Sequence, residues 1–153
     1  MVESNRIREI SDQMEIQGIL TLYCTSLDSK QYDGLDSVFT SDAFIDYTAS
    51  GGTKGQFPEV KAWLEEVLAL FSMTQHVVAN FDIKVSGDTA TSRCVFYNPM
   101  RFKTPEEKMP MFFVGGYYND KLIRTTDGWR ITERIEDLAW NYGEFPGEIE
   151  LPK

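Results

Sequence analysis

The hydrophobic residues in the first half of the chain recur at helical spacing in two stretches. The first covers residues 12–28, where apolar side chains fall three or four positions apart, on one face of a helix. This face consists of Ile16, Ile19, Leu20, Tyr23 and Leu27. Asp12 and Glu15 resemble a capping pair at its start. The second stretch is "FPEVKAWLEEVLALF", residues 57–71, which predicts a helix with a proline in its first turn.

A short helix and a strand are predicted between these two helices. In "YDGLDSVF", residues 32–39, Asp33 can cap a short helix. In "DAFIDYTAS", residues 42–50, polar and apolar residues alternate, which predicts a strand with polar groups on one face. The other face carries Ile45 and Tyr47.

The second half of the chain is predicted to be β-structure. Four strands are expected, at residues 74–85, 89–102, 111–125 and 129–140. Ser86-Gly87-Asp88 and Thr126-Asp127-Gly128 supply turns, and residues 103–110 form a loop. Turns between successive long strands indicate an antiparallel meander. The pair Gly115-Gly116 lies within a strand, where it favours a bend or a bulge.

Helices segregated from a run of strands predict an α+β fold. The length of 153 residues without a break in composition suits one domain, with a core at about 12–146, an N-terminal extension at 1–11 and a tail at 147–153. A strongly curved sheet wrapped over about three helices would enclose a cone.

Composition narrows the classes of partner and site. The net charge is −9, which would repel a phosphate backbone, so we expect no nucleic-acid partner. Cys24 and Cys94 lie in apolar segments without a CxxC motif, and the single histidine rules out a multi-histidine metal site. No run of residues has the length and composition of a signal peptide or a membrane span, so we expect a cytoplasmic protein with no membrane partner.

Four polar residues are candidates for chemistry. His76 is the only histidine, and an imidazole is the best general base near neutral pH if a carboxylate orients it. Asp28 ends the first helix, where the helix dipole disfavours an anion. Tyr47 could donate to a ligand carbonyl, and Asn119 lies mid-strand, where asparagine is disfavoured. Each could instead be an ordinary core or surface residue, and the sequence does not show that Asp28 and His76 meet.

Aromatic residues are abundant enough to line an apolar cavity as well as to fill a core. The aromatic candidates for the cavity wall are Trp63, Phe71, Phe96, Phe113 and Trp140. Phe112 and Val114 alternate with Met111, Phe113 and Gly115, so both faces of this strand are apolar. Such a strand is buried on both faces, which predicts either a covering helix or the interface of a homo-oligomer, a dimer or a trimer.

Four motifs occur in an order that resembles a known family. "SLDSKQYDGLDSVFTSDAFIDY", "TQHVV", "DGWRITERI" and "WNYGEF" look like the SnoaL-like branch of the nuclear-transport-factor-2-like superfamily, and within it scytalone dehydratase. The resemblance covers roughly residues 12–146. It implies a cone-shaped barrel with a curved mixed sheet, three helices and a deep apolar pocket, and it implies oligomers.

The resemblance also implies roles for particular residues. Asp28 and His76 match an aspartate and a histidine that face the pocket, Tyr47 matches a tyrosine that helps to bind a water near the substrate carbonyl, and Asn119 matches a substrate-contacting asparagine. The chain departs from the dehydratase at three positions. Leu27 replaces a tyrosine, Met100 replaces a second histidine and Tyr117 replaces a substrate-contacting serine, all of which would lie at the pocket. Scytalone itself is therefore not expected as the substrate.

Three functions remain open on this evidence. The first is a cofactor-independent enzyme that removes a proton next to the carbonyl of a small apolar or polycyclic compound, leading to dehydration, isomerisation or aldol-type cyclisation. His76 would be the base and Asp28 its orienting carboxylate, while Tyr47 and Asn119 would bind the enolate oxygen. The second is a binding module without catalysis, and the third is a structural subunit like the β-subunits of ring-hydroxylating dioxygenases. Whether the tail closes the pocket as a lid is also open.

Overall fold

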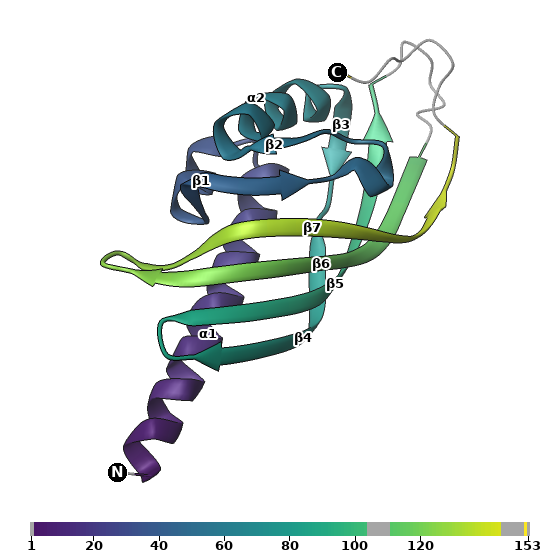
Figure 1. Cartoon of the computed structure of the whole chain (residues 1–153). Helices are drawn as coiled ribbons and strands as arrows, with labels where there is room; N and C mark the ends of the chain where they lie inside the picture. The colour runs from purple at the N-terminus through teal and green to yellow at the C-terminus, as the bar shows by residue number, and fades with distance from the viewer. Residues whose placement is uncertain (1, 104–110, 145–151, 153) are drawn as a thin grey trace.

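The chain folds into one curved sheet with helices on its concave side, as the computed structural model shows (Figure 1). The structure describes residues 2–103, 111–144 and 152. In chain order the elements are α1 (Val2–Asp28), η1 (Tyr32–Ser37), β1 (Phe39–Asp46), η2 (Thr48–Ser50), β2 (Lys54–Gln56), α2 (Phe57–Leu68), β3 (Phe71–Thr74), β4 (Val77–Ser86), β5 (Thr89–Phe102), β6 (Met111–Thr125) and β7 (Gly128–Tyr142). The expected α+β cone is confirmed, and its three helices are α1, η1 and α2, with the single turn η2 as an addition.

The sheet is mixed, and its last strand, β7, lies in the interior between β1 and β6. The order is β2-β1-β7-β6-β5-β3, and β4 also pairs with β5. Only β1 and β7 run parallel within the described sheet; every other pair is antiparallel. The strands β4 to β7 form the expected meander. Because β3 and β4 share one edge of β5, the chain must break between them, and this break holds Gln75 and His76.

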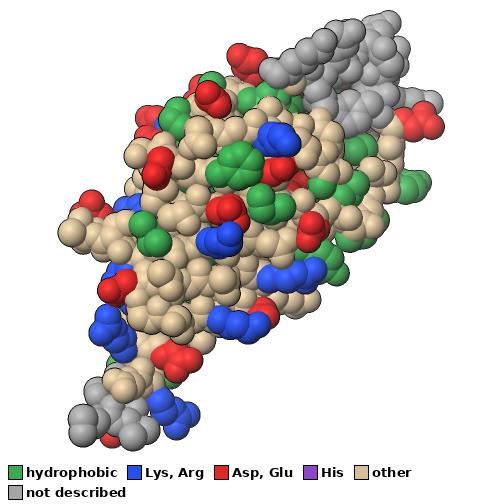
Figure 2. Space-filling model, in the orientation of Figure 1, with side chains coloured by type: hydrophobic (Ala, Val, Ile, Leu, Met, Phe, Trp, Pro, Cys, Tyr) green, Lys and Arg blue, Asp and Glu red, His purple; other side chains and the backbone are tan. Residues whose placement is uncertain are grey.

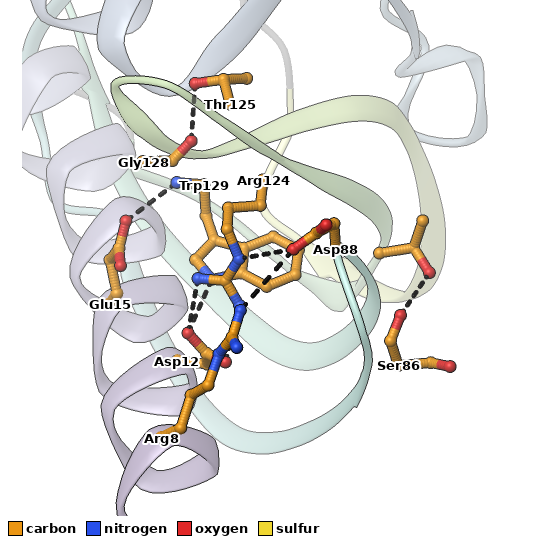
Figure 3. Close-up of polar contacts among 10 residues, drawn as sticks. Arg8, Asp12, Glu15, Ser86, Asp88, Arg124, Thr125, Gly128 and Trp129 are labelled. Atoms are coloured by element: carbon orange, nitrogen blue, oxygen red, sulfur yellow. Dashed lines mark hydrogen bonds and ion pairs between the residues drawn. The ribbon is translucent and has the colours of Figure 1, made fainter. Parts of the chain in front are cut away.

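The first helix is longer than the sequence pattern predicted, and Asp12 is not its cap. The helix already begins at Val2, so the expected N-terminal extension is its first part. The Asp12 carboxylate instead accepts two hydrogen bonds from Arg124, both 2.7 Å long, and one from the Trp129 indole (Figure 3). Glu15 accepts the backbone N–H of Trp129 in the same cluster. These acids therefore fasten α1 to the β6–β7 hairpin.

Four other predicted boundaries differ from the structure. The strand predicted at residues 42–50 is β1, Phe39–Asp46, and Thr48–Ser50 form the turn η2 instead. The expected strand 74–85 is two strands, β3 and β4, for the topological reason given above. The helix predicted at 57–71 ends at Leu68, because Phe71 already pairs with Phe102 of β5. Residues 32–37 form a 3-10 turn without a side-chain cap, and Asp33 forms an ion pair with Lys61 of α2 instead.

The glycine pair in β6 does bend the sheet, as its sequence predicted. The pairing of β6 with β7 shifts register between Gly115 and Gly116. A side chain at Gly116 would collide with the carbonyl oxygen of Asp137 and with the ring of Phe96. Only glycine therefore permits the two strands to approach at the bend that curls the sheet around the helices.

A buried cation lies in the middle of the concave face. The Arg134 side chain is fully buried, and its guanidinium donates to both oxygens of Asp120, at 2.7 and 2.8 Å. The same guanidinium lies 4.3 Å from the ring centres of Tyr23 and Tyr118. Burying an unpaired charge is costly. The Asp120 carboxylate and the faces of the two aromatic rings offset the cost of removing the Arg134 charge from water.

None of the described helices is long and apolar enough to cross a membrane. Cys24 and Cys94 are both free and buried, as their apolar surroundings predicted. Figure 2 views the outer side of the sheet, where hydrophobic side chains lie among interspersed acidic and basic ones.

Removing one partner of the buried pair should destabilise the fold strongly. Asp120→Asn leaves the Arg134 charge uncompensated in the core, so we expect the free energy of unfolding to fall by about 3 kcal/mol. Glu133→Gln, which breaks the exposed pair with Lys121 on the same two strands, should cost less than about 1 kcal/mol. Urea denaturation of the three proteins measures both values, and equal losses would contradict the role given to Arg134.

Candidate functional site

The concave face of the sheet, together with α1 and α2, encloses a mostly apolar cavity of about 100 Å³. Its wall carries a few polar side chains among aliphatic and aromatic ones. The polar and aromatic residues of the wall are Tyr23, Tyr47, Ser50, Trp63, Phe71, His76, Phe96, Asn98, Phe112, Tyr118 and Glu136, and the remainder are Gly52, Leu64, Val67, Leu68, Met100 and Val114. A small apolar pocket with few polar groups is the usual form of a ligand site.

Asp28 and His76, which the sequence could not place together, are in direct contact. The His76 ring Nδ1 lies 2.6 Å from Asp28 Oδ1, and the His76 backbone N–H donates to Asp28 Oδ2 at 2.8 Å. The Thr74 hydroxyl donates to Oδ1 at 3.0 Å. These contacts explain why an anion is tolerated at the last residue of α1, where the helix dipole opposes it.

The contact with Asp28 determines which ring nitrogen of His76 can act as a base. The carboxylate of Asp28 can only accept a hydrogen bond, so the neutral imidazole carries its proton on Nδ1. The other ring nitrogen, Nε2, is then free to take a proton. The His76 side chain is only 6% exposed and lies on the cavity wall. The Tyr23 ring stands edge-on to the imidazole, with 6.3 Å between ring centres, and limits its rotation. His76 is thus a packed ring and also an oriented one.

Tyr47 is paired with a second tyrosine that the sequence analysis had assigned only to the core. The hydroxyl groups of Tyr23 and Tyr47 are 2.7 Å apart and buried. Burial raises the pKa of both hydroxyls well above the usual value, so both are neutral. In such a pair one hydroxyl donates to the other, and the second proton remains available to a ligand oxygen. In the sequence, the spacing of Tyr23 on the apolar face of the first helix indicated only a core residue and not a site residue.

Glu136 is the site residue that sequence reasoning missed entirely. Its carboxyl group is buried on the cavity wall, and desolvation raises its pKa to about 7, although hydrogen bonding from the Ser50 side chain acts in the opposite direction. Simple alternation from Trp129 and Ile131 would point Glu136 outward. The register shift opposite Leu122 inserts an extra residue in β7 and reverses the alternation. Only the pairing of the strands reveals this inversion.

Four predicted site residues do not line the cavity. Asn119 and Tyr117 alternate with the inward Tyr118 on β6, so they face outward. The Asn119 amide donates to the Asp137 carboxylate at 2.9 Å, and the Arg93 guanidinium covers the Tyr117 ring. The role that the family resemblance implied for Asn119 therefore does not fit its place on the outer face.

Phe113 and Trp140 also lie on the outer face, where both rings contact Tyr97. Together with Tyr142 they form a cluster in which Trp140 is 46% exposed and Tyr142 is 73% exposed. The expectation of an oligomer built on the apolar outer face of this strand stays a prediction. By contrast, Trp63, Phe71, Phe96 and Met100 lie on the cavity wall, where they were expected.

The C-terminal tail, residues 147–153, lies outside the described residues apart from Pro152. The Trp63 indole N–H donates to the Pro152 carbonyl oxygen at 2.9 Å. Within the part of the chain that the structure describes, no three His, Cys, Asp or Glu side chains gather in a way that could hold a metal ion.

The raised pKa of Glu136 predicts how stability depends on pH. Between pH 4.5 and about 7 the folded protein keeps a proton that the unfolded chain has released, so the free energy of unfolding falls as pH rises through this range. The side chain of Glu136→Gln does not titrate, so the variant lacks this dependence of stability on pH. We expect the stability of the variant relative to wild type to rise by up to about 3 kcal/mol between pH 4 and pH 8, measured by urea denaturation. Parallel stability curves would show that the carboxyl group is not desolvated.

Comparisons with known proteins show which family this chain resembles. A SnoaL-like domain model matches residues 8–135. The uncharacterized protein Rv2910c of Mycobacterium tuberculosis is 45% identical over 130 residues, which cover 85% of this chain and 87% of that protein.

Two solved structures share the fold at low sequence identity. A Novosphingobium aromaticivorans protein assigned as a scytalone dehydratase is 21% identical with a TM-score of 0.78, covering 98% of this chain and 100% of that one. A type 2 hexachlorocyclohexane dehydrochlorinase, LinA, is 17% identical with a TM-score of 0.78, covering 94% of this chain and 99% of that one. The match of the domain model over most of the chain, with the cone-shaped fold, shows that this protein belongs to the SnoaL-like family.

Proposed function

We propose that this protein is a lyase or isomerase that removes a proton from the carbon next to the carbonyl group of a small, mostly apolar compound. The observation that carries the proposal is the pair Asp28–His76, whose imidazole lies on the wall of an apolar cavity. A base oriented by a carboxylate and shielded from water is what this chemistry requires. Proton transfer of this kind needs no group beyond the side chains of the protein.

Each side chain has a definite part in the proposed step. His76 Nε2 takes the proton from carbon, and Asp28 stabilises the imidazolium that forms. The free hydroxyl proton of the Tyr23–Tyr47 pair then binds the developing enolate oxygen, at a position where the apolar wall strengthens the hydrogen bond. The enolate can expel a leaving group from the neighbouring carbon or take a proton back at another atom. These outcomes correspond to elimination and isomerisation.

The structural neighbours are consistent with an elimination. One is assigned as a dehydratase and another is a dehydrochlorinase, and both names describe loss of a small molecule from a substrate. In this chain the cavity offers Met100 where scytalone dehydratase has a second histidine. His76 must therefore act as the only imidazole, which favours reactions that a single base can begin.

Exchange of carbon-bound protons tests the proposal without knowledge of the natural substrate. A bicyclic ketone such as 2-tetralone is incubated with the protein in D₂O, and loss of the signals next to the carbonyl is followed by NMR. We expect the protein to accelerate exchange, His76→Gln to reduce the rate to that of buffer, and Tyr47→Phe to lower it by about 10²-fold because one hydrogen-bond donor is lost. Tyr97→Phe, on the outer face, is the matched control and should exchange at the wild-type rate.

The binding module is the alternative outcome of the same experiment. If 2-tetralone binds to the wild-type protein but exchanges no faster than with His76→Gln, the cavity binds ligands without catalysis. Unchanged exchange in His76→Gln would likewise exclude His76 as the base.

The state of the imidazole can be measured independently of any ligand. With a single histidine in the chain, its two ring ¹⁵N signals are assigned without ambiguity. We expect the Nδ1-protonated tautomer in the wild type and a mixture of tautomers in Asp28→Asn, because the amide can donate as well as accept. Asp33→Asn, an exposed acid, is the control and should leave the signals unchanged. Identical spectra for wild type and Asp28→Asn would contradict the dyad.

A further inference from the structure

One carboxyl oxygen on the cavity wall is buried without a partner. Glu136 is 7% exposed, and its Oε1 has no hydrogen-bond partner among the described residues. Leaving a buried polar atom unpaired costs free energy that an apolar side chain of the same size would avoid. An atom in this state on the wall of a ligand cavity is therefore a position for a hydrogen bond from a ligand.

Glu136 and the proposed base lie on the wall of the same cavity, at different places along the curved sheet. His76 precedes Val77, which pairs with Tyr97 on β5, whereas Glu136 of β7 pairs with Tyr118 on β6. Three strand spacings separate β4 from β7, roughly 14 Å along the curved sheet. A ligand that fills the cavity can thus present one group to His76 and another to Glu136.

The surroundings of Glu136 determine which kind of group it can take. Above pH 7 the Glu136 carboxylate has lost its proton and can only accept, so a group that binds Oε1 there must donate a hydrogen bond. The Arg134 guanidinium interacts electrostatically with Glu136 from two residues away on the same strand face. Since Asp120 compensates this charge, what disfavours an amine is the loss of hydration that an ammonium group would suffer in the mostly apolar cavity. The neutral donor that fits is a hydroxyl group.

We propose that Glu136 is a hydroxyl-binding site, so that the ligand of the cavity is a ketone that carries a hydroxyl group remote from the carbon attacked by His76. The inference rests on the proposed function, because it takes the ligand to be a carbonyl compound, and it narrows that function to hydroxylated ketones. The Glu136 carboxyl group accepts a hydrogen bond from the ligand hydroxyl group, and no covalent bond forms or breaks there. The contact selects the substrate and fixes its orientation in the cavity.

Binding of matched ketones tests the site. The probes are 2-tetralone and its phenolic isomers, each with one ring hydroxyl group, titrated by calorimetry or NMR. At pH 8, where the Glu136 carboxylate is ionised, we expect at least one isomer to bind the wild-type protein about tenfold more tightly than 2-tetralone, as one added hydrogen bond to a charged group would produce. Glu136→Met, which keeps the length of the side chain but removes the acceptor, should lose this gain, so that no phenolic isomer binds the variant more tightly than 2-tetralone does. Asp137→Asn, an outward acid next to it, should keep the gain.

A second measurement needs no ligand. If Oε1 is unpaired because it awaits a ligand, Glu136→Met should raise the melting temperature at pH 8 by about 2–4 °C or more. A lower melting temperature would show that the carboxyl group is paired for stability and would overturn the proposal. It would also be overturned if no phenolic isomer bound the wild type more tightly than 2-tetralone, or if the gain persisted in Glu136→Met.

The two proposals can fail separately. Exchange of 2-tetralone and the tautomer of His76 depend on the Asp28 end of the cavity and do not involve the Glu136 hydroxyl contact. Normal exchange without a hydroxyl gain would therefore remove only the site at Glu136. A hydroxyl gain without exchange would leave a cavity that selects hydroxylated ketones but does not act on them.

Discussion

The buried ion pair between Arg134 and Asp120 is the interaction on which the interior of the cone depends. A fully buried guanidinium must be compensated, and here both oxygens of Asp120 and the rings of Tyr23 and Tyr118 do so. The cation thereby fixes the position of the tyrosine rings that lie on the cavity wall. It also places a positive charge near Glu136, so the polarity of the cavity follows from the same residue.

The Asp28–His76 contact is produced by two separate features of the fold that meet at one point. Helix α1 ends at Asp28, and the sheet breaks between β3 and β4 because both strands share the edge of β5. The break frees the backbone N–H of His76, and the end of the helix supplies a carboxylate to accept it. The carboxylate is stabilised by the histidine, and the histidine is oriented by the carboxylate. Structural and chemical roles therefore coincide in this pair.

The cavity wall combines an oriented imidazole, a pair of tyrosine hydroxyls and a buried carboxyl group with apolar side chains. Low polarity strengthens each of these groups as a hydrogen-bonding partner and keeps the tyrosine hydroxyls neutral. The same burial makes Glu136 expensive to charge. Of these groups only Glu136 has an oxygen unpaired among the described residues, which lowers stability unless a ligand binds there.

The sequence alone determined the class of fold, the meander from residue 89 onward and the bend at Gly115-Gly116, because these features depend on local periodicity and on the backbone freedom of glycine. It also marked Asp28, His76 and Tyr47, since an acid at a helix end and a single histidine are locally unusual. It could not determine which face a residue occupies once a strand contains an irregularity. The extra residue in β7 turned Glu136 inward, and the family resemblance assigned Asn119 to a cavity that it does not line. Contacts between residues 48 positions apart, such as Asp28 and His76, exist only because the sheet curls, and strand pairing, which no local pattern records, decides how it curls.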